Sequence, residues 1–215
     1  MTSETAEIII PTTTEQVDRR KSLLQAAFDV IASSGFEGLR TRAVAARASV
    51  NIATLHYYFP TKQSLIEGLA QFLSAIFATL HAPPPRSTGR KALDHLRQEF
   101  IDAQFYHDRY PELQVVMEEL SLRSKRDLAV ETALQSLLKS WRFWIETIVR
   151  EGIAEGSFRQ DLDTEKTIPM LMAVLSGRSV VGIAELDNIQ QGVESWLLAP
   201  GVKEEVELKL QGEKQ

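Results

Sequence analysis

The chain has 215 residues, of which 44% are hydrophobic and 25% are charged, and it contains no cysteine. This composition can bury a core and argues against a disordered chain, and the lack of cysteine excludes disulfides and zinc–thiolate sites. Residues 1–10 lack the basic start and the long apolar run of a signal peptide. No stretch reaches the roughly 18 consecutive apolar residues of a membrane span. We therefore expect a soluble, cytoplasmic protein with no membrane partner.

The net charge of −5 is distributed unevenly along the chain. Residues 19–62 carry seven basic and two acidic side chains, a net charge of +5, and the segments on either side are acidic. A basic segment on an acidic protein favours a local site for a polyanion, because Coulombic attraction depends on patches and not on totals. Chance clustering of charges on a solvated face explains the same pattern, so charge alone leaves both interpretations open.

Apolar residues recur with helical periodicity along nearly the whole chain, and the sequence predicts an all-α fold of about nine helices. The first expected helix begins after capping threonines at 12–14 and ends at 33–35. Three prolines at 83–85 interrupt the pattern. Residues 203–215 are strongly charged and are expected to form a tail or a frayed helix. The further expected helices span 41–48, 52–58, 62–80, 90–107, 111–123, 127–155, 163–184 and 189–198.

Residues 41–59 have the pattern of two short helices joined by a tight turn. Apolar side chains such as Val44 and Leu55 would face the first helix of the chain. Asn51 can cap the second short helix by accepting from a backbone N–H two or three residues later. This is the geometry of a helix-turn-helix, whose second helix enters the major groove of DNA. A generic pair of short helices shows the same apolar pattern, so the spacing alone does not decide between them.

Several short pieces of sequence make the interpretation more specific. They are Ala26-Ala27-Phe28 before Gly35, the run Thr41–Ala45, the run Thr54–Phe59, and Lys62 with Leu65. The stretch from Lys21 to Leu69 that contains them resembles the DNA-binding domain of the tetracycline-repressor (TetR) family. The later segment Glu151–Phe158 is similar to a common segment of that family's C-terminal domain. Two positions depart from the pattern: Ser49 stands where the family usually has glycine, and His56 where it usually has tyrosine.

The resemblance implies a domain organisation. We expect a flexible segment at 1–14, a three-helix DNA-binding domain at 15–62 and a larger helical effector-binding and dimerisation domain at 63–202, followed by the charged segment 203–215. A left-handed backbone at Ser49 would cost a non-glycine residue roughly 1 kcal/mol.

The resemblance also suggests which residues contact DNA. Arg42 could pair with guanine or could be a phosphate contact or a free surface residue. Asn51 could serve only as a cap, and Tyr57 is favoured over Tyr58 as the phosphate donor. Lys62 begins a helix, where a phosphate is also favoured. The candidate DNA-binding residues are Arg42, Asn51, Ile52, Ala53, Thr54, His56, Tyr57 and Lys62.

Two further sets of residues are expected in the C-terminal region, with ordinary core packing as the alternative for most of them. The candidate effector site is lined by Phe100, Gln104, His107, Met117, Trp141, Trp144, Ile145 and Met170. The candidate dimer interface consists of Ile168, Leu171, Met172, Leu175, Ser179, Gly182, Ile189, Val193, Trp196 and Leu197.

Together these features predict a ligand-responsive transcriptional regulator. We expect a repressor that binds palindromic operator DNA as a homodimer and is released by a small apolar or aromatic effector. An activator of the same fold, or a helical interaction protein without DNA binding, would share the pattern. An enzyme is disfavoured because the sequence has no phosphate-binding glycine loop, no nucleophile triad and no metal-ligand spacing; no catalytic residue, metal or cofactor is expected.

Overall fold

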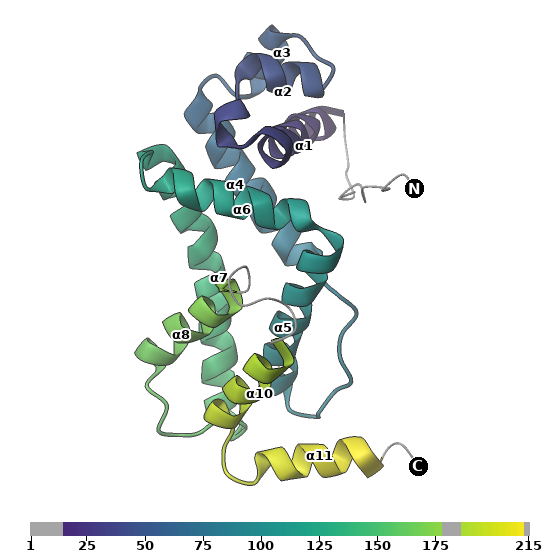
Figure 1. The fold of residues 1–215 in the computed structure, drawn as a ribbon, viewed down its shortest axis with the longest axis vertical. Helices are drawn as coiled ribbons and strands as arrows, with labels where there is room; N and C mark the ends of the chain where they lie inside the picture. Colours follow the sequence, from purple (N-terminus) through teal and green to yellow (C-terminus); the bar gives the residue numbers. More distant parts are fainter. Residues whose placement is uncertain (1–14, 178–185, 213–215) are drawn as a thin grey trace. The chain divides into compact units, whose positions relative to one another are not determined.

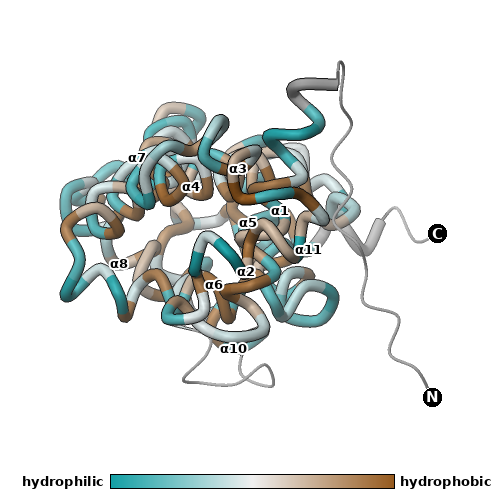
Figure 2. The backbone as a smooth tube through the Cα atoms, turned by 90° about the horizontal axis from the view of Figure 1, so that it is seen from above, coloured by the Kyte–Doolittle hydropathy of each residue, from teal (hydrophilic) through white to brown (hydrophobic). Residues whose placement is uncertain are grey.

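The computed structural model of the chain describes residues 15–177 and 186–212 (Figure 1). Within these ranges the regular structure is helical, which confirms the all-α prediction, and only Phe158 and Leu198 form an isolated antiparallel bridge. None of the described helices combines the length and the hydropathy that crossing a bilayer requires. Hydrophobic and hydrophilic stretches alternate along the helices (Figure 2), as expected for amphipathic helices that bury one face.

The expected helices are found close to their predicted bounds. The prediction at 163–184 is met by a helix that ends at Ser176 with Gly177 as its cap. Residues 178–184, which include Ser179 and Gly182, lie outside the described residues, as do residues 1–14. The elements are α1 (Glu15–Ser34), the 3-10 helix η1 (Phe36–Gly38), α2 (Thr41–Arg47), α3 (Ile52–Tyr58), α4 (Lys62–Thr79), α5 (Lys91–Arg109), α6 (Pro111–Ser124), α7 (Leu128–Ala154), α8 (Thr164–Ser176), α10 (Leu186–Leu197) and α11 (Val202–Gly212).

The described chain forms two compact units. The head unit comprises the residues up to 80 together with 106–139, and the body unit comprises 81–105 together with the residues from 140 onward. The helices α5 and α7 contribute residues to both units. The head unit therefore contains the predicted DNA-binding segment together with α4, α6 and the first part of α7.

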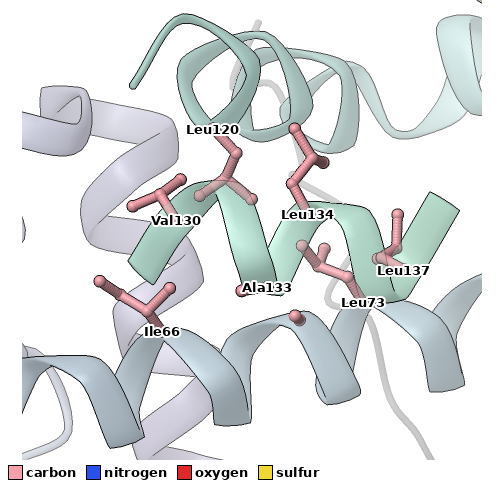
Figure 3. Close-up of a pocket in the computed structure, with 8 residues that line it drawn as sticks. Ile66, Leu73, Leu120, Val130, Ala133, Leu134 and Leu137 are labelled. Carbon is pink, nitrogen blue, oxygen red and sulfur yellow. The ribbon is translucent and has the colours of Figure 1, made fainter. Parts of the chain in front are cut away.

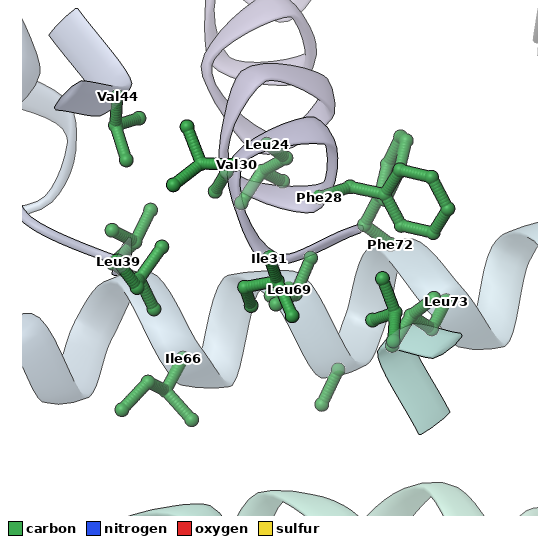
Figure 4. Packing of buried hydrophobic residues seen from close by; sticks show 14 of the residues in the cluster. Leu24, Phe28, Val30, Ile31, Leu39, Val44, Ile66, Leu69, Phe72 and Leu73 are labelled. Atoms are coloured by element: carbon green, nitrogen blue, oxygen red, sulfur yellow. The ribbon is translucent and has the colours of Figure 1, made fainter. Parts of the chain in front are cut away.

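The head unit is built around α1, which contacts η1, α2, α4 and α6. Its apolar residues recur three and four positions apart, so that one stripe of the helix is buried. In Figure 4, Ile31 of α1 lies against Leu69 of α4. Val44 and Leu55 of the two short helices are also buried in this core, as the sequence predicted. The helix α1 thus packs against the buried side of the α2–α3 pair, and the outer surface of the pair is exposed to solvent.

The N-terminus of α4 is fixed by a reciprocal capping box. The hydroxyl of Thr61 accepts from the backbone N–H of Ser64 at 3.0 Å, and the backbone N–H of Thr61 donates to the Ser64 hydroxyl at 3.2 Å. Such a box satisfies donors that would otherwise lack partners and begins the helix at a defined residue. Lys62 therefore occupies a fixed backbone position at the edge of the head unit.

The body unit contains the segment Glu151–Phe158 that resembled a family segment. Phe158 is fully buried, and its ring lies on the backbone of α7 at Gly152. A Cβ at that glycine would come within 2.1 Å of the ring's Cδ2 atom, so only glycine fits there. The chain leaves α7 through Gly156, whose φ of +76° also favours glycine. The motif thus folds the chain back onto the end of α7.

The charged C-terminal segment is an ordered helix rather than a tail over its described part. Val202 and Val206 of α11 are buried in the core of the body unit, four residues apart on one face of the helix. The carboxylate of Glu205 forms an ion pair with Arg90. The helical alternative of the prediction for 203–215 therefore describes α11, which buries Val206 together with the preceding Val202.

Candidate functional site

The turn between α2 and α3 has the tight geometry expected of a helix-turn-helix. Ser49 has a φ of 54°, the one left-handed non-glycine residue in the described ranges. The next backbone N–H, of Val50, donates to the Ala45 carbonyl at 2.9 Å and closes the turn. The family pattern placed glycine at this position, and the structure shows that serine adopts the same conformation, at a cost of about 1 kcal/mol.

Asn51 caps α3, as the sequence suggested. Its Oδ1 accepts from the backbone N–H of Thr54 at 2.7 Å and from the Thr54 hydroxyl at 3.0 Å. The amide oxygen is therefore already used within the protein, and only the amide N–H groups of Asn51 remain available for a further contact. The cap orients the first turn of α3, whose outer side chains are exposed.

The outer face of α3 is open to solvent. Ile52 is 39% exposed, and Ala53, His56 and Tyr57 are exposed as well. Tyr57 is 75% exposed, whereas Tyr58 packs against the core of the head unit, in agreement with the predicted division between the two tyrosines. Thr54 is half-buried because it takes part in the cap. This face presents apolar, imidazole and phenol groups side by side.

The basic residues around this face differ in how far their charge is neutralised. Arg47 forms an ion pair with Asp29 of α1 at 2.7 Å. Arg42 is exposed and has no ion pair with any described residue. Lys62 is exposed and its ammonium lies 4.8 Å from the centre of the Phe36 ring. Arg42 and Lys62 thus carry positive charge that is available to an anionic partner.

Comparisons with known proteins agree with this geometry. The family model of bacterial regulatory proteins, tetR family, matches residues 23–69, which run from α1 to α4. The model of the YsiA-like protein, C-terminal region, matches residues 90–181. The chain belongs to the TetR family. It is a DNA-binding, ligand-responsive transcriptional regulator of that family.

Relatives and solved structures of the TetR family extend over most of the chain. The transcriptional repressor KstR2 of Mycolicibacterium smegmatis is 29% identical over 156 residues, which cover 72% of this chain and 74% of the relative. A TetR transcription regulator from Haloarcula marismortui has the same fold, with a TM-score of 0.67 at 20% identity, covering 84% of this chain and 99% of that one. The multidrug binding protein EbrR, complexed with imidazole, has a TM-score of 0.58 at 19% identity, covering 86% and 92%.

In this TetR-family head unit, α6 is bound directly to the segment that precedes the helix-turn-helix. The carboxylate of Glu119 accepts from the backbone N–H of Phe36 at 2.8 Å, and Arg123 pairs with Glu37 at 2.8 Å. The Glu119 carboxylate thereby satisfies a backbone donor of η1. No spacing in the sequence joins residues 83 positions apart, so this contact could not be predicted.

The eight predicted effector-site residues are distributed over α5, α6, α7 and α8 and over both units. Phe100 and Ile145 are buried in the core of the body unit, whereas Met117 packs against the core of the head unit. Met170 is 52% exposed, and His107 is exposed with its Nδ1 3.1 Å from the Gln114 side-chain oxygen. That these residues line one effector site stays a prediction.

A small apolar cavity does occur in the head unit, and none of the predicted effector residues lines it (Figure 3). It has room for about one water molecule. Its walls come from α4, α6 and α7, and Leu120 closes it from α6, next to Glu119. The lining residues are Ile66, Ala70, Leu73, Leu120, Val130, Ala133, Leu134 and Leu137.

Two of the predicted effector residues, Trp141 and Trp144, bind a carboxylate that was not among the sequence-based candidates. Glu99 of α5 accepts hydrogen bonds from the indole N–H groups of Trp141 and Trp144 of α7. Burial raises the pKa of this carboxyl, although the two indole donors favour its charged form. Gln104, five residues after Glu99 on α5, is half-buried. A glutamate on a charged helix gives no sign in the sequence that it faces inward.

Most of the predicted dimer-interface residues are buried within a single chain. Ile168, Leu171 and Leu175 of α8, and Val193 and Leu197 of α10, form part of the core of the body unit. Met172, Ile189 and Trp196 are half-buried and pack against the same core. The fully buried members of these apolar stripes face the core of their own chain, whereas Met172, Ile189 and Trp196 keep part of their surface exposed, and the dimer contact itself stays a prediction. The opposite faces, including Met170 and Ala173 of α8, are the exposed ones.

Proposed function

We propose that the protein is a homodimeric repressor that binds a palindromic operator through α3 and releases it when a small molecule binds. The observation that supports this most directly is the exposed outer face of α3, held by the Asn51 cap and flanked by Arg42 and Lys62. A helix-turn-helix presents this face to base edges, whereas the surrounding cations bind phosphates. The relative KstR2 is named a transcriptional repressor, which supports repression over activation for this protein.

Each residue around α3 has a proposed role that follows from its environment. Arg42 is free to pair with guanine or phosphate, and Ile52 and Ala53 offer apolar surface to thymine methyl groups. His56 and Tyr57 are exposed hydrogen-bonding groups. The main proposed role of Asn51 and Thr54 is to cap α3, and a contact with DNA is a secondary role. Lys62 supplies charge without sequence preference.

Dimerisation is proposed because one helix-turn-helix contacts only a few base pairs. A palindromic operator needs two copies whose recognition helices lie about 34 Å apart. The exposed faces of α8 and α10 are proposed to form the contact, in place of the buried stripes. The solved EbrR structure with imidazole shows that a protein of this fold holds a small molecule, and we propose that a small effector acts here. The hydrogen bond between Glu119 and Phe36 directly connects α6 to η1, the segment that precedes the helix-turn-helix.

An electrophoretic mobility shift experiment with the duplex upstream of the protein's own gene tests this proposal. We expect binding that weakens steeply with salt, since phosphate contacts release counterions, and a footprint of two symmetric half-sites. A true effector must also bind more weakly when operator is present, because linkage is reciprocal. Indifference to every duplex at low salt, or a monomer on the operator, would refute the proposal.

A further inference from the structure

Glu99 of the body unit is a carboxylate placed between two aromatic side chains. Its Oε2 accepts from the indole Nε1 of Trp141 at 3.0 Å, and its Oε1 accepts from that of Trp144 at 2.8 Å. Within the described ranges no lysine or arginine forms an ion pair with it. Neutral donors therefore hold this carboxylate, and its charge is left without a cation. Each of its oxygens has accepting capacity beyond the single indole bond.

His95 precedes Glu99 by one helical turn and lies on the same face of α5. Its ring lies 5.0 Å from the ring of Trp144, between centroids. The Nδ1 atom of this imidazole is buried and has no hydrogen-bond partner in the part of the chain that the structure describes. A buried polar atom without a partner is costly and is rare in native proteins. It is the kind of group that a bound molecule satisfies.

The surroundings of Glu99 are negative. Asp102, three residues further along α5, is buried and already bound: His81 Nδ1 lies 2.7 Å from one oxygen, and the backbone N–H of Ala82 donates to the other at 2.8 Å. The stripe of His95, Glu99 and Asp102 thus holds two carboxylates. Trp144 is partly exposed, so the Glu99 end of this stripe is reachable from solvent.

We propose that Glu99, His95, Trp141 and Trp144 form a recognition subsite for a protonated amine carried on an aromatic or apolar body. One N–H of the ammonium would donate to the Glu99 carboxylate and another to Nδ1 of His95. The indole and imidazole rings would contact the apolar body and attract the positive charge. A neutral alcohol lacks the charge for Glu99, and a quaternary ammonium lacks the N–H for His95. The inference deepens the proposed function, on which it rests, by naming the chemical class of the effector.

The direct test is calorimetric titration of the full-length protein with 2-phenylethylammonium, and with 2-phenylethanol as its neutral analogue. We expect the wild type to bind the ammonium at least about tenfold more tightly than the alcohol. This preference should disappear in Glu99→Gln and remain in Glu204→Gln, which neutralises an exposed carboxylate of the same unit. Equal binding of the two probes, or an unchanged preference in Glu99→Gln, would overturn the proposal.

A second variant protects the test against misfolding of the first. His95→Phe keeps an aromatic ring beside Trp144 and removes the unpartnered nitrogen. We expect it to weaken binding of 2-phenylethylammonium while leaving binding of its trimethylammonium derivative unchanged. If both cations lose affinity equally, or neither does, the role assigned to His95 is wrong.

Titration of the same ammonium into the operator complex separates this inference from the proposed function. Release of operator by the wild type but not by Glu99→Gln supports both. Binding to the free protein without any effect on operator supports the subsite and contradicts its role as the effector site. A protein that binds the amine but no duplex at all contradicts the proposed function and leaves the subsite intact.

Discussion

The two units of the chain differ in how directly their sequence reveals which surface is used. In the head unit, α2 and α3 are so short and so tightly joined that the buried positions fix the exposed ones. In the body unit, the long amphipathic helices show clear apolar stripes, but the pattern does not say whether a stripe faces its own chain or a second copy. The stripes of α8 and α10 proved to face their own core. A local motif therefore defines a surface that a helical periodicity alone does not.

The largest effect that we expect from a single substitution lies in the body unit, at the glycine on which Phe158 rests. Gly152→Ala would place a Cβ 2.1 Å from the Phe158 ring, so the ring or the helix must move. We expect a loss of about 3 kcal/mol in the free energy of unfolding, measured by chemical denaturation. Gly192→Ala on α10, where no atom lies within 4 Å, is the control and should be neutral or stabilising. Equal effects of the two changes would contradict the packing described for the family segment.

The next effect tests which arginines of the head unit are available to DNA. Arg42→Ala should weaken operator binding by about 1–3 kcal/mol and relax specificity at one base pair. Arg47→Ala is the matched control and should cost less, because Asp29 already neutralises that guanidinium at 2.7 Å. Fluorescence anisotropy with operator and with scrambled duplex measures both quantities. A larger loss for Arg47 than for Arg42 would reverse the assignment.

A smaller effect is expected at the cap of α3. Asn51→Ala removes the acceptor for the Thr54 backbone N–H and should lower stability by about 1 kcal/mol. Asn51→Asp keeps the cap oxygen and should preserve the stability, but it adds a negative charge at the DNA surface and should weaken operator binding. If Asn51→Ala lowers operator affinity and leaves the thermal unfolding midpoint unchanged, Asn51 acts as a base contact and not as a cap.

The smallest effect concerns the turn itself. Ser49→Gly should stabilise the protein by about 0.5–1 kcal/mol, because glycine adopts a φ of 54° without the penalty that serine has. The control variant Ser33→Gly in α1 should do the opposite, since glycine is unfavourable within a helix. Chemical denaturation of both variants measures the difference. A destabilised Ser49→Gly would mean that the serine side chain contributes more than the backbone conformation costs.

The fold and the helix-turn-helix could be predicted from the sequence because both depend on patterns among residues close together in the chain. Helix periodicity gave the helices, the apolar pattern of 41–59 gave the buried side of α2 and α3, and Asn51 was identified as a cap from its position. For 203–215 the sequence left a tail or a frayed helix open, because the charged residues around Val206 hide its burial against the core. The inward stripe of α8 was recognised as apolar, but its partner could not be identified without the positions of the other helices.

The groups that the sequence did not reveal are those defined by contacts between distant segments. Glu119 satisfies the backbone of Phe36 across 83 positions, and Glu99 meets Trp141 and Trp144 across 42 and 45 positions. Both glutamates lie on helices rich in charge, where an acidic residue is ordinarily solvated. Only the packing of one helix against another shows that these two carboxylates are bound by the protein.

The most direct test of the central claim is selection of preferred duplexes from a random library, with the wild type and with a variant changed at Ile52, Ala53 and His56 of α3. If this face reads base edges in both subunits of a dimer, the variant should select a changed sequence at the same positions of two symmetric half-sites. Selection of the same sequence by both proteins, or of a sequence without symmetry, would show that α3 does not read the operator in the way proposed.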